Sequence, residues 1–125
     1  MKVFLGGTCS GYKWRDKLIP MLKCDYYNPI VKNWQESDRI REVHEREHAD
    51  IVLYVITSGL KGVYSIAEVT DDSNKRPTKV VFCVLNQGFD KQMNHSLEAV
   101  KNLIKDNGSY VCDNLEAVAE YINAR

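Results

Sequence analysis

The sequence predicts an α/β fold, a three-layer α/β/α sandwich built on a five-stranded parallel, flavodoxin-like sheet. Residues 51–56 are an unbroken apolar run rich in β-branched residues, and residues 79–85 form a second strongly apolar segment. Such runs are typical of strands buried on both faces of a parallel sheet. Five strand-like segments alternate with five helical ones, without a repeat or linker. We therefore expect one domain spanning residues 1–125.

The first half of the chain alternates short apolar segments with amphipathic ones. A proline late in the first helical segment predicts a kink or an early end, because proline lacks the N–H that a helix interior needs. The second helical segment is highly charged and carries only a narrow apolar stripe, which is typical of a surface helix. The predicted elements are a strand at 2–5, a helix at 12–24, a strand at 25–27, a helix at 37–48 and the central strand at 51–56.

The second half follows the same alternation. A clear helical stripe over residues 93–104 stops at Asn107-Gly108, a typical helix end. Asp113, followed three residues later by Glu116, is predicted to cap the last helix. The predicted elements are a helix at 65–73, a strand at 79–85, a helix at 93–104, a strand at 109–112 and a final helix with its apolar stripe over 115–122.

The overall composition excludes several classes of partner. Lys plus Arg equals Asp plus Glu, 17 of each, so no global field attracts a nucleic acid polymer or a membrane surface. Apolar runs are of strand length, and the N-terminus leads into a strand rather than a signal peptide. The cysteines show no paired CxxC spacing, so we expect reduced thiols in a cytoplasmic protein. They are Cys9, Cys24, Cys83 and Cys112.

The functional site is predicted where the loops at the carboxyl ends of the strands converge. Gly6, Gly7 and Thr8 form either a tight turn or a turn whose amides also bind an anion, although neither GxGxxG nor a P-loop is present. Arg15 either reaches a phosphate or pairs with a nearby acidic residue. The converging loops are residues 6–11, 28–34, 57–64 and 86–89, with Asn28, Trp34, Ser58, Gly62 and Tyr64 as further candidates.

Glu68 is the strongest candidate for a chemical role, and it has two interpretations. Ser65 and Glu68 have the S-x-x-E spacing of a capping box, in which Glu68 bonds back to the Ser65 amide and does no chemistry. Alternatively, Glu68 is a carboxylate aimed into the site from the start of a helix. Tyr64 and Trp34 are each either a pocket wall or ordinary packing residues. Ser58 and Ser65 fit turn and cap positions.

The segment 44–48, HEREH, matches the HExxH pattern of zinc proteases, in which His44 and His48 bind the metal and Glu45 is the base. The pattern fixes only three residues, and a helix this rich in His, Glu and Arg meets it easily. The one remaining histidine, His95, falls in a different predicted helix, so no convincing third ligand follows. We expect no metal at this position.

The ordered segments VFLGGT, WRDKLIPML, NPIV, ADIVLYVI and GVYSIAEV resemble the nucleoside 2-deoxyribosyltransferase-like superfamily, over about the first 90 residues. The resemblance implies that Glu68 is the nucleophile and that Glu42 is a second catalytic acid. Family members have Ser or Asp where this chain has Gly62, and an aromatic hydroxyl where it has Phe4. Ser58 or Ser65 would have to substitute for the missing side chain.

The same resemblance implies the chemistry. A carboxylate attacks the anomeric carbon of a nucleoside or nucleotide and forms a covalent glycosyl intermediate, which passes to another base or to water. It also implies a homo-oligomer without a cofactor. The Gly6 and Gly7 amides, together with Arg15, would hold a 5′-phosphate. The alternative is a module that binds or sequesters a nucleotide in the same pocket without turnover.

Overall fold

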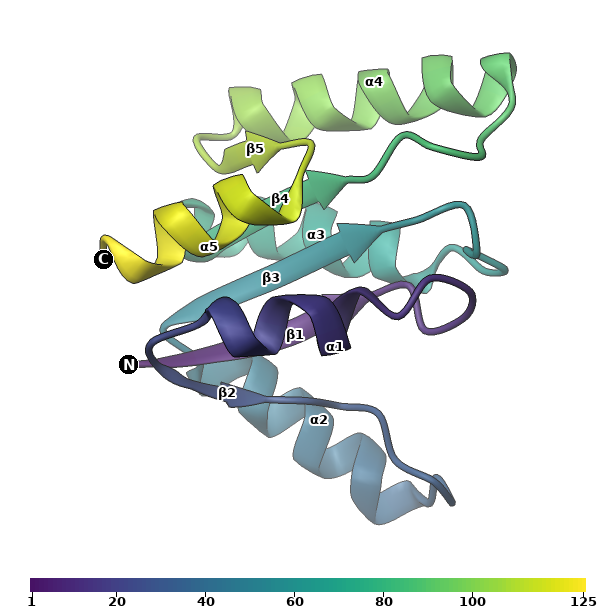
Figure 1. The fold of residues 1–125 in the computed structure, drawn as a ribbon. Helices are drawn as coiled ribbons and strands as arrows, with labels where there is room; N and C mark the ends of the chain where they lie inside the picture. The colour runs from purple at the N-terminus through teal and green to yellow at the C-terminus, as the bar shows by residue number, and fades with distance from the viewer.

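The computed structural model describes residues 1–125 and has a single five-stranded sheet (Figure 1). All strand pairs are parallel, and the strand order is β2-β1-β3-β4-β5. The predicted flavodoxin-like sheet is therefore confirmed. Its strands are β1 (Lys2–Gly7), β2 (Asp25–Tyr27), β3 (Ile51–Ile56), β4 (Val80–Val84) and β5 (Tyr110–Cys112).

Helices cover both faces of this sheet. Two of them, α1 (Trp14–Leu18) and α5 (Leu115–Asn123), contact each other on one face. The opposite face carries α2 (Glu36–His48), α3 (Tyr64–Lys75) and α4 (Lys91–Asp106), which confirms the three-layer arrangement. Short 3₁₀ helices, η1 (Ile19–Met21) and η2 (Pro77–Lys79), complete the fold. None of the helices combines the length and the apolarity that crossing a membrane requires.

The core is divided by the sheet into two apolar clusters. Because side chains alternate along a strand, the odd-numbered residues of β3 pack toward α1 and α5, whereas the even-numbered ones pack toward α3 and α4. Every residue of β3 is fully buried. The central strand is thus covered on both faces, as its unbroken apolar run predicted.

The ends of several helices differ from the prediction. Pro20 stops the first helix early, as expected, and lies in η1. The last helix is capped by Asn114, whose Oδ1 accepts from the Ala117 amide at 2.7 Å, so the predicted Asp113 cap is wrong. An N-cap side chain bonds to the amide three residues later. The helix begins one residue later than the Asp113–Glu116 pattern required, so the capping pair is Asn114 and Ala117.

The register of β1 opens a space at the edge of the sheet. Strand β2 ends at Tyr27, which is paired with Phe4, whereas β1 continues to Gly7 along β3. The last part of β1 therefore has a strand on one side only. From β1 the chain first runs to β2 on one side and then crosses back to β3 on the other side, so the direction of the strand order reverses here. Such a reversal is the topological switch point at which open α/β sheets bind ligands.

Candidate active site

A cavity of about 460 Å³ lies at this switch point. It is bounded by the end of β1, the connection after β2, the middle of α2 and the start of α3. Two carboxylates, from Glu42 on α2 and Glu68 on α3, line the same space. The full lining is Phe4, Gly6, Gly7, Cys9, Arg15, Pro29, Ile30, Val31, Trp34, Glu42, Tyr64, Ser65 and Glu68.

Most of the site residues predicted from sequence lie together here, and four do not. Thr8 and Asn28 line an adjoining cavity of about 340 Å³, which shares Cys9, Arg15 and Ile30 with the first. Ser58 lines a cavity on the opposite face of the sheet. Gly62 is exposed and lines none of these cavities. The predicted residues that share the main cavity are Gly6, Gly7, Arg15, Trp34, Glu42, Tyr64, Ser65 and Glu68.

Glu68 is not engaged in a helix cap. Helix α3 begins at Tyr64 with Val63 as its N-cap and no side-chain capping bond, so the Ser65–Glu68 capping box is wrong. The amides of Ile66 and Ala67 bond instead to the Val63 carbonyl. Because the helix begins before Ser65, Ser65 lies within its first turn and Glu68 is the fifth residue. The Glu68 carboxylate is therefore available to the cavity.

The environment of Glu68 favours its protonated form. Its side chain is only 11% exposed, and its one ion-pair partner, Arg46 Nη1, is 3.8 Å from Oε2. Burial raises the pKa of Glu68 to about 7; Arg46 opposes this shift, while Glu42 and Asp72 add to it. A carboxyl group with a pKa near neutrality exchanges readily between its acid and ionised forms at physiological pH.

Arg46 forms ion pairs with both Glu68 and the buried Asp72, and neither Arg46 nor Asp72 was predicted from the sequence as part of the site. Asp72 is fully buried and accepts bonds from the Tyr54 hydroxyl at 2.6 Å and from Arg46 Nε at 3.1 Å. The signal was present in the spacing, because Arg46 follows Glu42 by four residues and Asp72 follows Glu68 by four. Residues four apart share one face of a helix, so each pair points toward the same place.

Tyr54 places a hydroxyl group within the otherwise apolar central strand β3. Its hydroxyl is buried, and a buried tyrosine hydroxyl needs a partner, which Asp72 supplies. Burial, followed by the neighbouring charges of Asp72 and Glu68, raises the pKa of Tyr54 above its ordinary value. The phenol therefore remains a neutral donor to Asp72.

Arg15 lies beneath the loop that follows β1 rather than on the surface. Its Nε donates to the Leu5 carbonyl at 3.0 Å, and its Nη1 donates to the Thr8 carbonyl at 2.8 Å. A longer bond of 3.4 Å joins Nη2 to Gly7. These bonds use three of the five guanidinium N–H groups. Burial lowers the pKa of Arg15, against the opposing effects of Cys9 and Glu42. No carboxylate forms an ion pair with its guanidinium. The alternative of an exposed ion pair is therefore wrong.

Gly6 and Gly7, the last two residues of β1, pack so closely against β3 that a side chain would not fit. A Cβ on Gly6 would lie 2.7 Å from Cε1 of Tyr54, and one on Gly7 would overlap the Val55 carbonyl. Gly7 also has φ +117°, a conformation that other residues rarely adopt. Both glycines bring β1 close to β3, and the same absence of side chains leaves room at the floor of the cavity.

The HEREH segment, residues 44–48, lies on α2, where its side chains make contacts unrelated to metal binding. Glu45 forms an ion pair with Lys2 at 3.0 Å, and Nδ1 of His48 is 2.8 Å from the His44 carbonyl oxygen. The structure has no group of three or more His, Cys, Asp or Glu side chains placed to hold a metal ion.

Glu68→Gln is expected to stabilise the fold in a pH-dependent way. The folded-state pKa of about 7 exceeds the ordinary 4.5, so the folded chain binds more protons than the unfolded one between these values. Wild-type stability should therefore fall as the pH rises through this window, whereas glutamine stays neutral. Urea unfolding should show the variant about 2–3 kcal/mol more stable than wild type at pH 8 and nearly equal at pH 5.

The exposed Glu47 of α2 supplies the control. Glu47→Gln should change the free energy of unfolding by the same small amount at both pH values. A Glu68→Gln effect that does not grow with pH would contradict the environment described for this carboxyl group.

These features define a class of protein: a flavodoxin-like α/β domain with two carboxylates in one cavity at its switch point. The sequence profile of the family described as nucleoside 2-deoxyribosyltransferase like matches residues 1–89. The chain belongs to that family, and the resemblance seen in the sequence is confirmed. The matched segment contains every residue that lines the cavity. Searches of curated proteins and of solved structures found no significant match.

Proposed function

We propose that the protein is an enzyme that breaks the N-glycosidic bond of a nucleoside or nucleotide, with Glu68 as nucleophile. The observation that carries this proposal is the placement of Glu42 and Glu68 in one cavity at the switch point. Paired carboxyl groups suit cleavage of a glycosidic bond because one attacks the sugar as a nucleophile while the other protonates the leaving group as a general acid. Family membership supports a nucleoside as the ligand.

In the proposed reaction, ionised Glu68 attacks C1′ of the sugar. The glycosidic bond breaks, its electron pair leaves with the base, and Glu42 donates the proton that neutralises the departing nitrogen. A second base, or water, then attacks C1′, gives its proton to the Glu42 carboxylate and releases Glu68 from the covalent intermediate. Transfer and hydrolysis differ only in that second acceptor.

The remaining residues of the cavity have proposed binding roles. Arg15 provides a buried positive charge with no acidic partner, which favours a 5′-phosphate near Gly6 and Gly7. Trp34 and Tyr64 are more than half exposed at the cavity and supply faces for a base. Thr8 and Asn28, in the adjoining cavity, would contact a ligand that extends beyond Arg15.

The test is direct. Purified protein is incubated with a panel of nucleosides, nucleotides and NAD, and released base is followed by chromatography, with and without an added acceptor base. Release from any member of the panel supports the enzyme, and dependence on the acceptor separates transferase from hydrolase. Stable binding of a panel member without release identifies the second candidate, a nucleotide-binding module. The glycine at position 62 favours that candidate, because it has no side chain with which to contact a ligand.

Arg46→Met is expected to raise the pKa of Glu68 above its value of about 7. Arg46 is the cation that opposes the effect of burial, and loss of an adjacent opposite charge shifts a carboxyl group by about one unit or more. Carbon-13 NMR of the Glu68 carboxyl resonance during a pH titration measures the shift. Arg46→Lys keeps the charge and should show a smaller rise; an unchanged pKa in the Met variant would contradict the assigned role.

We also propose that the protein is a homo-oligomer of the cytoplasm. Large apolar side chains beside the cavity are exposed, as expected for a surface that a second copy covers. Sedimentation analysis of wild type against Trp34→Ser tests the assembly, since loss of an exposed aromatic should weaken it. The exposed apolar residues of this region are Ile30, Val31, Trp34, Ile40, Val63 and Tyr64.

A further inference from the structure

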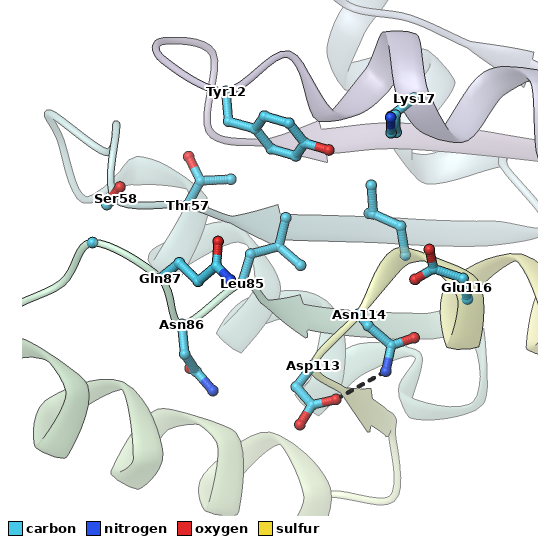
Figure 2. A pocket seen from close by; sticks show the side chains of 12 residues that line it. Tyr12, Lys17, Thr57, Ser58, Leu85, Asn86, Gln87, Asp113, Asn114 and Glu116 are labelled. Atoms are coloured by element: carbon cyan, nitrogen blue, oxygen red, sulfur yellow. Dashed lines mark hydrogen bonds between the residues drawn. The ribbon is translucent and has the colours of Figure 1, made fainter.

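A second and larger cavity, of about 600 Å³, lies on the opposite face of the sheet from Glu68. It is formed where the carboxyl ends of β3 and β4 meet α1 and the start of α5. Figure 2 shows the ring of Tyr12 on one side and Leu85 on the other. Leu115, which is buried, adds to the apolar lining. The space is of the size that small-molecule sites have.

Charged groups face this space from both sides. Lys17 lies on α1 and Glu116 lies in the first turn of α5, which places a cation and an anion across the cavity from each other (Figure 2). The one hydrogen bond among the lining side chains joins Asn114 to Asp113. Lys17, Glu116 and the Gln87 amide are therefore free to bind a molecule that enters.

We propose that this cavity binds a planar heterocycle whose edge carries a carbonyl oxygen beside a ring N–H and an amino group, the edge shared by guanine and the pterins. The ring would lie between Tyr12 and the apolar side chains of Leu85 and Leu115. The Glu116 carboxylate accepts from the ring N–H and the amino group as a bidentate pair. Lys17, with the Gln87 amide, donates to the carbonyl oxygen.

This arrangement discriminates between heterocycles. Adenine presents no carbonyl oxygen to Lys17 and has an unprotonated ring nitrogen where Glu116 needs a donor, so two acceptors would face each other. Two facing acceptors form no bond and repel each other, so adenine is disfavoured by more than the loss of one contact. The site is independent of glycosidic chemistry, because it lies across the sheet from both Glu42 and Glu68.

The experiment is a pair of NMR titrations of the full chain, one with guanosine and one with neopterin. At least one probe should shift the resonances of Tyr12, Gln87 and Glu116, and the tighter probe identifies the source of the ring. Adenosine should bind at least about tenfold more weakly. Repeating the titration on Glu68→Gln, which should not turn guanosine over, reads binding without catalysis. Failure of the proposed glycosidic function leaves this result unaffected.

Glu116→Gln tests the residue that carries the selectivity. It should weaken binding of the tighter probe about tenfold, because it removes a charge-assisted pair of bonds. Glu120→Gln, one turn along the same helix and outside the cavity, should leave binding unchanged. The proposal is overturned if neither probe shifts the cavity resonances, if adenosine binds equally well, or if Glu116→Gln binds like wild type. Shifts confined to the residues around Glu68 would also overturn it.

Discussion

Glu68→Gln is expected to reduce release of base from the substrate by at least about 10³-fold. Glutamine has nearly the same shape but cannot form the covalent bond to C1′, so the first step fails. The ligand should still enter the cavity, because Phe4, Gly6, Arg15 and Trp34 are untouched. Single-turnover assays measure the loss, and equilibrium dialysis with the same substrate measures the retained binding.

Two controls make this result specific to the nucleophile. Glu47→Gln changes an exposed carboxylate on α2 outside the cavity and should keep full turnover. Mass spectrometry of acid-quenched wild type should detect a glycosyl adduct on the peptide that contains Glu68, and the Glu68→Gln variant should lack it. Wild-type turnover retained by the variant would refute the assignment of Glu68.

Asp72→Ala is expected to destabilise the fold by about 3–5 kcal/mol. Its carboxylate is fully buried and binds Arg46 and Tyr54, while Arg76 lies 3.5 Å away. Removal leaves a largely buried guanidinium with fewer partners and a buried hydroxyl with none, and both pay a desolvation cost. Urea unfolding followed by circular dichroism measures the change.

The neighbouring Asp71 provides a matched control. Asp71 also forms an ion pair with Arg46, at 2.9 Å, but its side chain is 41% exposed. Asp71→Ala should therefore cost no more than about 1 kcal/mol, as exposed ion pairs generally do. Equal losses in the two variants would show that burial of Asp72 does not set its importance.

The fold could be predicted because its signals are local. The apolar run of β3 and the stripe of α4 each encode their environment within a single segment, and alternation of strands with helices leaves few topologies. Helix starts were less predictable. Ser65 and Asp113 both have a good cap pattern, yet the backbone begins α3 two residues earlier and α5 one residue later than those patterns required.

The site was predictable in part, for a physical reason. Strand order places the end of β1 beside α3, so Gly6 and Glu68 could be brought together from sequence alone. The direction of a side chain depends on tertiary contacts that no local pattern holds. Ser58 therefore faces the opposite cavity, and Arg15 is bound to carbonyl groups under its loop.

The way α2 is attached has a consequence for access to the cavity. No residue of α2 is buried, and the helix is joined to its neighbours through Arg46 and through the Lys2–Glu45 pair. One wall of the cavity is thus held by charge, whereas α3 on the other side is anchored by a buried valine. Salt weakens the attraction of the more exposed Lys2–Glu45 pair most, because the pair of Arg46 with the fully buried Asp72 is screened much less, and salt does not weaken apolar burial. Hydrogen exchange in rising salt should therefore quicken along α2 before it does along α3, so this wall of the cavity should open more readily than the other.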